Sequence, residues 1–170
     1  THQILGQIGV SDKENEIPAF RRMLSEQQPF VWGMLLVGDA LHTQKETVEQ
    51  ILSSQADYLL FVKLNQEDLA NELRTFFAKL PFQTLTDEAT LREVTKGRDI
   101  RTTVTVSSDS YMSSYLQKEY GWTGVKAIGV LHRVGDRMEI DQRTKKVKVN
   151  PIDETVYLIC SKLLSAKQLT

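Results

Sequence analysis

The stretch Val31-Trp32-Gly33-Met34-Leu35-Leu36-Val37-Gly38-Asp39-Ala40 decides the class of fold. Residues 31–37 form a continuous apolar run, which is typical of a strand buried on both faces of a sheet. A carboxylate, Asp39, follows almost at once, at the end of the strand where open α/β sheets place ligands and metal ions. We therefore predict a buried strand over 31–37 and take Asp39 as the first candidate for a functional residue.

Helices and strands alternate around this stretch. The sequence predicts a strand over 4–10, a helix from Pro18 to Gln27, a helix that begins near Thr43, and a strand over 56–64. Asn65 is the expected N-cap of the next helix, whose apolar stripe repeats at helical spacing and consists of Leu69, Leu73, Phe76, Phe77 and Leu80. This alternation implies α/β layers with at least part of the sheet parallel.

The pattern changes after Pro81. Strands are predicted over 102–107, 125–132 and 155–160, a helix over 110–120, and a polar hairpin from 137–140 and 145–149. A further helix is expected to begin over 165–169. The composition, with 41% hydrophobic and 25% charged residues, excludes disordered, collagen-like and coiled-coil proteins. We expect residues 1–170 to form a single domain.

The sequence gives no sign of a membrane or of secretion. No apolar run approaches the roughly 20 residues that cross a bilayer, and no basic segment followed by an apolar one opens the chain. The single cysteine, Cys160, excludes an intramolecular disulfide and metal sites built on cysteine clusters, and it fits a cytoplasmic protein. Because Cys160 lies in an apolar strand, we expect it in the core and not as a nucleophile.

The charges are unevenly distributed along the chain. Residues 1–94 carry 8 basic and 14 acidic side chains, whereas residues 95–170 carry 13 basic and 8 acidic ones. This asymmetry permits contact with a polyanion on one side of the molecule. The alternative is that the two halves neutralise each other across the fold.

Three segments offer cations to a nucleic-acid backbone. Lys63-Leu64-Asn65-Gln66 places a lysine and two amides at a helix start, where phosphates bind readily. Arg98 and Arg101 lie in a cationic strand opening, and 133–148 carries six cations and three acids. The structural alternatives are a plain helix cap, a charged strand end and a solvated hairpin.

Asp39 also has a purely structural interpretation, because an Asp after a strand often caps a turn or a helix. The three histidines, His2, His42 and His132, have no zinc-site spacing, and His42 is expected to face solvent. The sequence contains no glycine-rich phosphate loop and no nucleophile elbow. Trp122 is expected to anchor the core.

Several short blocks resemble, in the same order, the insertion-sequence transposases of the H-repeat-associated group. The blocks cover nearly the whole chain and are Leu5-Gly6-Gln7, Glu14-Asn15-Glu16-Ile17, Gly38-Asp39-Ala40-Leu41-His42-Thr43-Gln44, Ala56-Asp57-Tyr58-Leu59, Lys63-Leu64-Asn65-Gln66, Gly97-Arg98, Tyr157-Leu158-Ile159-Cys160-Ser161 and Ser165-Ala166.

This resemblance implies a ribonuclease-H-like fold, an α/β mixed sheet flanked by helices, with a DDE active site. In such a site two Asp and one Glu hold two divalent ions, Mg²⁺ or Mn²⁺, for cleavage of DNA phosphodiesters. Asp39 aligns with the second acid. The first Asp of the family lies upstream of Leu5-Gly6-Gln7 and the Glu lies downstream of Ser165-Ala166, beyond Thr170. The chain is therefore expected to be the central part of the catalytic core, lacking its N-terminal strand and C-terminal helix.

The resemblance predicts a segment of a bacterial DNA transposase that cleaves DNA and transfers its strands, with Lys63, Asn65, Gln66, Arg98 and Arg101 as DNA-binding residues. With one carboxylate of three, the chain alone is expected to be inactive. The family usually has Lys-Gly-Asn-Gln at 63–66, and this departure keeps open an inactive DNA-binding or interaction remnant. An unrelated α/β domain is a third option. A homodimer is a further expectation.

Overall fold

A computed structural model describes residues 16–26, 28–80, 84–95, 97–140, 143 and 146–170. Its centre is a six-stranded mixed sheet in the order β1-β2-β6-β5-β4-β3. Only β1 and β2 pair in parallel, and the other neighbours are antiparallel. The strands are β1 (Leu35–Gly38), β2 (Asp57–Val62), β3 (Thr86–Thr95), β4 (Arg98–Ser107), β5 (Ala127–Ile140) and β6 (Val147–Cys160).

In the part of the chain that the structure describes, five α-helices and three short 3₁₀ helices accompany the sheet. The α-helices are α1 (Glu16–Glu26), α2 (Gln28–Val31), α3 (Lys45–Ser53), α4 (Glu67–Ala78) and α5 (Ser110–Tyr120). The 3₁₀ helices are η1 (Ala40–His42), η2 (Leu64–Gln66) and η3 (Ala166–Gln168). Within the described ranges, none of the helices is both long enough and apolar enough to span a membrane.

The two faces of the sheet carry separate apolar clusters, because successive side chains of a strand point to opposite faces. On one face, Leu60, Ile128 and Ile159 pack under residues of α1, α3, α4 and α5, and we call this the helix face. On the other face, Leu59, Leu131 and Leu158 pack with residues of β4 and with Ala166 of η3. We call this second face the Asp39 face, because Asp39 lines a cavity on it together with Leu131.

Each helix is placed by a buried stripe and by its end residues. In α4 the stripe consists of Leu69, Leu73 and Phe76. The α5 helix begins where the Asp109 carboxylate accepts a hydrogen bond from the Met112 N–H at 2.7 Å. It ends at Gly121, whose φ of 71° is the left-handed conformation that glycine adopts without strain. These local signals explain why α5 has the predicted bounds, 110–120.

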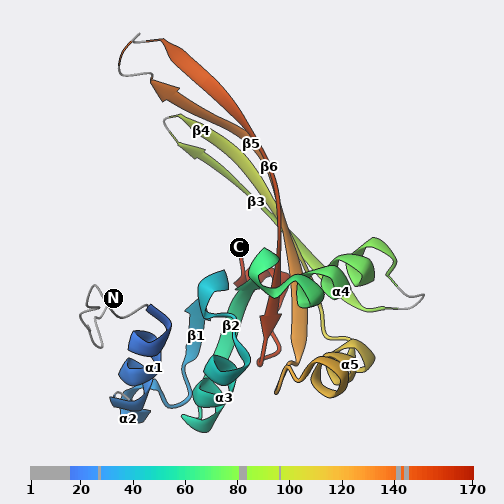
Figure 1. Ribbon diagram of the computed structural model, residues 1–170. Helices are drawn as coiled ribbons and strands as arrows, with labels where there is room; N and C mark the ends of the chain where they lie inside the picture. The colour runs from blue at the N-terminus through green and yellow to red at the C-terminus, as the bar shows by residue number, and fades with distance from the viewer. Residues whose placement is uncertain (1–15, 27, 81–83, 96, 141–142, 144–145) are drawn as a thin grey trace.

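Strands β3 to β6 extend beyond the helices as an arm (Figure 1). Its two longest strands, β5 and β6, pair over 14 residues each, from Ala127↔Cys160 to Ile140↔Val147. Gly135 is required in the arm, because a Cβ at this position would overlap the Asp99 carbonyl oxygen of β4. The close approach of β4 and β5 therefore depends on a residue without a side chain.

Most predicted elements are present, including the parallel pairing, the helices after Thr43 and over 110–120, and the strands over 102–107 and 155–160. The buried strand over 31–37 is wrong: Val31 belongs to α2, and Val37 is 65% exposed. The reason is that, among the described residues, β1 is an edge strand that pairs only with β2, and strand alternation puts Val37 on the Asp39 face, opposite the helices that cover Leu36. β3 was not predicted. The predicted strand over 4–10 lies outside the described residues.

The strands of the polar hairpin are longer than predicted. Residues 125–132 and 137–140 largely belong to one strand, β5, and residues 145–149 and 155–160 largely belong to β6. Polar residues such as Asp136 and Glu154 interrupt the apolar pattern without interrupting the strands. An exposed arm pairs its backbone regardless of side-chain polarity, which apolar periodicity does not report.

We predict that Gly135→Ala destabilises the protein by about 2–4 kcal/mol, because the new methyl group forces β4 and β5 apart. Urea unfolding followed by circular dichroism measures the change. Gly33→Ala is the control: its φ is also positive, at 71°, but nothing lies within 4 Å of the added carbon. It should cost only about 1 kcal/mol. Equal losses in the two variants would contradict the close approach at Gly135.

Candidate functional site

Asp39 follows the last residue of β1 and is the N-cap of η1. Its carboxylate oxygen Oδ1 accepts a hydrogen bond from the Leu41 N–H at 3.0 Å, so the predicted capping role is confirmed. None of the described residues donates a hydrogen bond to the other oxygen, Oδ2, and the residue is exposed. Capping thus fixes the carboxylate in place and leaves one oxygen available.

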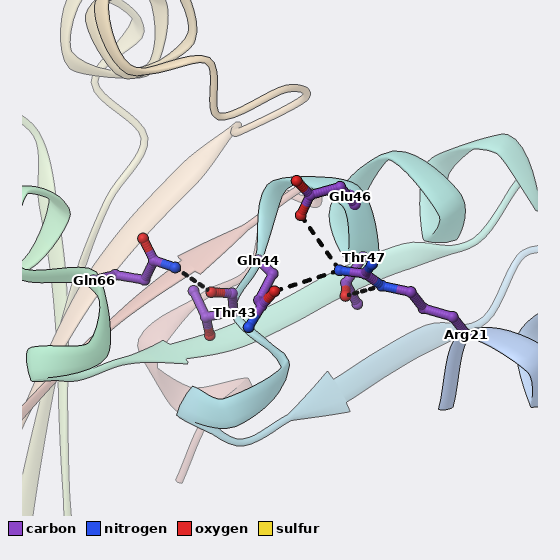
Figure 2. Close-up of polar contacts among 6 residues, drawn as sticks. All are labelled: Arg21, Thr43, Gln44, Glu46, Thr47 and Gln66. Atoms are coloured by element: carbon purple, nitrogen blue, oxygen red, sulfur yellow. Dashed lines mark hydrogen bonds and ion pairs between the residues drawn. The ribbon is translucent and has the colours of Figure 1, made fainter. Parts of the chain in front are cut away.

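The loop that carries Asp39 is tied to the end of β2. The hydroxyl group of the fully buried Thr43 donates to the Phe61 carbonyl oxygen at 2.5 Å. The Asn65 amide nitrogen donates to the Ala40 carbonyl oxygen at 2.5 Å, and the Gln66 amide nitrogen to the Thr43 carbonyl oxygen at 2.9 Å. Figure 2 shows Gln66 reaching Thr43 from the neighbouring segment. The loop is therefore held from β2 and η2 together.

Asn65 is not the N-cap of α4, as the sequence had indicated. The N-cap is Gln66, and its side chain makes no capping hydrogen bond. The extra turn of η2 lies between Lys63 and α4, and it turns both amide groups towards the Asp39 loop. In this structure the amide nitrogens of Asn65 and Gln66 position the loop.

A second attachment joins α1 to the start of α3. The Arg21 guanidinium donates to the Thr47 hydroxyl at 3.1 Å, to the Gln44 side-chain oxygen at 3.4 Å and to the Glu46 carboxylate at 3.3 Å (Figure 2). Gln44 follows Thr43 directly. The Asp39 loop is thus fixed at its exit as well, by a cation on another helix.

His42 packs inside this loop, so its predicted exposure to solvent is wrong. Its ring lies 4.6 Å from the Phe20 ring, centroid to centroid, and the residue is half-buried. Its Nδ1 atom is buried without a hydrogen-bond partner in the described structure. Aromatic packing against α1 explains this position. No group of three or more His, Cys, Asp or Glu suited to a metal ion occurs among the described residues.

A cavity of about 160 Å³ opens beside Asp39 on the Asp39 face. It is lined by Asp39, Ala40, Phe61, Lys63, Leu131, Arg133, Glu154 and Val156. An adjoining, mostly apolar groove of about 580 Å³ shares Lys63 and Glu154 with it and runs along α4. Lys63 therefore lines the same cavity as Asp39, a proximity that the sequence had not predicted.

Arg133 and Glu154 are neighbours of Asp39 that the sequence did not single out. They are opposite each other on β5 and β6, and their charged groups are 4.0 Å apart. Both side chains are about half exposed. The signal that would identify them is the strand register, which brings position 133 opposite 154 on β6, the strand that pairs with β2. A linear sequence does not contain this register.

The two arginines near Gly97 point to different faces. Strand alternation places Arg98 on the Asp39 face, directly opposite Arg137 of β5. Arg101 lies on the helix face, where it lines a separate hollow with Arg92 and Asp99. Arg92 donates two hydrogen bonds to Asp99, at 2.8 and 2.7 Å, and this guanidinium lowers the pKa of the Asp99 carboxyl. Of the two, only Arg98 shares a face with Asp39.

Cys160 and Trp122 belong to the core, as predicted. Both are almost fully buried. Burial raises the pKa of the Cys160 thiol to about 11, so the thiolate that a nucleophile requires is scarce at neutral pH. Cysteine chemistry therefore has no place in this site.

The fold and the site define an α/β protein with a fixed, exposed carboxylate at the carboxyl end of a strand, next to two cations. A family model described as "Transposase DDE domain" matches residues 1–170, and the chain belongs to this family. The recognition made from the sequence blocks is confirmed.

Two relatives from Escherichia coli are similar to the chain. It is 28% identical to "Putative transposase YncI" of strain O157:H7 over 97% of its own length and 40% of that protein's. It is 29% identical to "Putative protein YbfL" of strain K12 over 75% of its own length and 33% of that protein's. The chain thus spans less than half the length of these relatives. A comparison with solved structures finds no match.

We predict that Thr43→Val destabilises the protein by about 1–3 kcal/mol, because the hydrogen bond from the buried Thr43 hydroxyl to the Phe61 carbonyl oxygen is lost. Thermal and urea unfolding measure the loss. Thr90→Val is the matched control, since the Thr90 hydroxyl contacts only Thr103 at the surface of the arm. If both variants unfold at the same urea concentration, the Asp39 loop does not depend on Thr43.

We also predict that Cys160 resists a thiol reagent such as DTNB at pH 8 in the folded protein and reacts fully in 6 M guanidinium chloride. The reason is the combination of burial and a raised pKa. Absorbance of the released thiol measures the reaction. Rapid labelling of the folded protein would place Cys160 outside the core.

Proposed function

We propose that the chain is the central segment of the catalytic core of an insertion-sequence transposase, which cleaves DNA phosphodiesters and transfers the strands with the help of divalent ions. The observation that carries the proposal is Asp39: in a chain that belongs to the DDE transposase family, a fixed carboxylate with one available oxygen ends strand β1. We propose residues 1–170 as one partial domain of that core.

The donor chemistry of Asp39 fits Mg²⁺ or Mn²⁺. Both ions prefer carboxylate oxygens, and Oδ2 of Asp39 has no hydrogen-bond donor among the described residues. One carboxylate does not hold two ions, so the other two acids of the triad are proposed to come from outside these residues. When bound, the ions would polarise the phosphodiester and activate the attacking oxygen. The role of this chain's own residues is to hold Asp39 and the DNA.

A ribonuclease-H-like arrangement accounts for several features of the fold. The helices α1 and α3 lie on the helix face, which leaves the Asp39 face for a further helix. η3 already packs on that face, and the Ala166 N–H donates to the Asp87 carboxylate at 2.7 Å. A free edge of β1 among the described residues offers pairing for another strand. These features support the proposal that the missing strand and helix complete the site from both sides.

DNA is the partner that the family implies. We propose that DNA contacts the Asp39 face, where Lys63 and Arg98 lie. Asn65 and Gln66 support binding by holding the loop, and DNA contacts of their own stay a prediction. Arg101 lies on the other face, so its DNA contact stays a prediction for that face. A homodimer and a place in the bacterial cytoplasm, without a membrane partner, stay predictions too.

An inactive DNA-binding or interaction remnant is the second candidate. The observation in its favour is that the described residues contain no group of three or more His, Cys, Asp or Glu that could hold a metal ion. Such a remnant would bind DNA with a steep salt dependence that neither metal nor Asp39→Asn alters.

We predict that Asp39→Asn lowers divalent-ion-dependent DNA nicking by more than about 100-fold in the full reading frame that encodes this chain, because a ligand to the activating ion is lost. Conversion of supercoiled plasmid to open circles in Mg²⁺ or Mn²⁺ measures the activity. Glu119→Gln, on the exposed side of α5, removes the same charge and should nick normally.

The 170-residue chain alone is the second arm of this experiment. We expect it to be inactive, and metal-dependent nicking by it that Asp39→Asn abolishes would contradict the incomplete site. Equal nicking by the wild type and by Asp39→Asn in the full reading frame would remove Asp39 from the mechanism. No nicking by either protein would favour the inactive remnant.

A further inference from the structure

Arg133 lines the cavity beside Asp39, and its ion pair with Glu154 is loose. Its guanidinium approaches the Glu154 carboxylate at 4.0 Å, which is longer than a hydrogen bond. On the opposite face of the same arm, by contrast, Arg92 donates two hydrogen bonds of 2.8 and 2.7 Å to Asp99. The donors of Arg133 are therefore available to a better acceptor.

The cavity beside Asp39 has room for such an acceptor. Its volume of about 160 Å³ is enough for several water molecules, and a phosphate group has five heavy atoms. Lys63, an exposed lysine, lines the same cavity from the end of β2. A guanidinium matches two phosphate oxygens at once, and an ammonium adds a point charge.

We propose that Lys63 and Arg133 form a binding site for a phosphodiester of duplex DNA next to Asp39, and that Glu154 occupies Arg133 until DNA displaces it. The proposal rests on the proposed function for the identity of the polyanion. Glu154 then acts as a resident competitor. It neutralises Arg133 in the free protein, and its carboxylate turns away when a phosphate enters.

The position of Glu154 fixes the sign of its effect on binding. It is the cross-strand partner of Arg133, so it lies on the same face and lines the same cavity. A carboxylate at this place repels a phosphate and competes for its donor. Removing its charge should therefore strengthen DNA binding, which is the opposite of what the loss of a structural ion pair would do.

The experiment measures binding of a fluorescein-labelled 30-base-pair duplex by anisotropy, in EDTA, so that Asp39 and its ions do not contribute. We expect Arg133→Gln to weaken binding about 10-fold and to flatten the slope of log K against log salt by about 0.9, the value for one lost phosphate contact. Lys118→Gln, an exposed change on α5, is the charge-matched control and should alter binding less than about twofold.

Glu154→Gln should tighten DNA binding about 3- to 10-fold. Glu119→Gln on α5, the charge-matched control, should change DNA binding less than about twofold. In the double variant Arg133→Gln/Glu154→Gln the gain should fall below about twofold, because Glu154 acts mainly by occupying Arg133 and only the weaker direct repulsion is left. Arg133→Lys keeps the charge without the fork and should fall between Arg133→Gln and wild type. Unchanged thermal unfolding of each variant shows that the fold is intact.

An equal gain from Glu154→Gln with and without Arg133 would overturn the competitor role. If Arg133→Gln and Lys118→Gln weaken DNA binding by factors that agree within twofold, the proposed phosphate site is wrong. In both cases the proposed function survives if Asp39→Asn abolishes nicking. If the wild-type protein nicks DNA but its binding of the duplex does not depend on salt, only the proposed phosphate site is wrong. If the wild-type protein neither binds nor nicks DNA, both proposals are wrong.

Discussion

The buried hydrogen bond from the Thr43 hydroxyl to the Phe61 carbonyl oxygen is the contact on which the site depends. Parallel pairing of β1 and β2 brings the ends of these strands to the same edge of the sheet, but it does not fix the loops that follow. Thr43 joins the loop after β1 to the end of β2. Asn65 and Gln66 then add two further bonds to the same loop. The loop that carries Asp39 is therefore held by side-chain-to-backbone hydrogen bonds that join it to β2 and η2.

Much of the fold could be predicted from the sequence, because the body of the molecule follows ordinary periodicity. The stripe of Leu69, Leu73 and Phe76 and the cap at Asp109 identified their helices. The arm is different. β3 is exposed along nearly its whole length, so it has no buried alternation to reveal it. The prediction of a buried strand over 31–37 was wrong for a related reason, because hydrophobicity alone does not distinguish a central strand from one at the edge of a sheet.

The residues of the candidate site also differ in whether the sequence could predict them. Asp39 and Lys63 could be found because each directly follows an apolar strand. Asn65 and Gln66 were predicted at a helix start, but their amide nitrogens bond to a loop that lies more than twenty residues earlier in the chain. Arg133 and Glu154 join Asp39 only through the register of β5, β6 and β2. Register is decided by the whole sheet, and a single sequence carries no local mark of it.

The arm also sets a length scale. A strand of 14 residues extends for about 46 Å at about 3.3 Å per residue. Arg133, near the cavity, and Arg137, opposite Arg98, are four residues apart on β5, which is about 13 Å at about 3.3 Å per residue. One turn of a DNA duplex repeats after about 34–36 Å. A duplex lying along the arm would therefore present one short stretch of its backbone, about a third of a turn, to these cations.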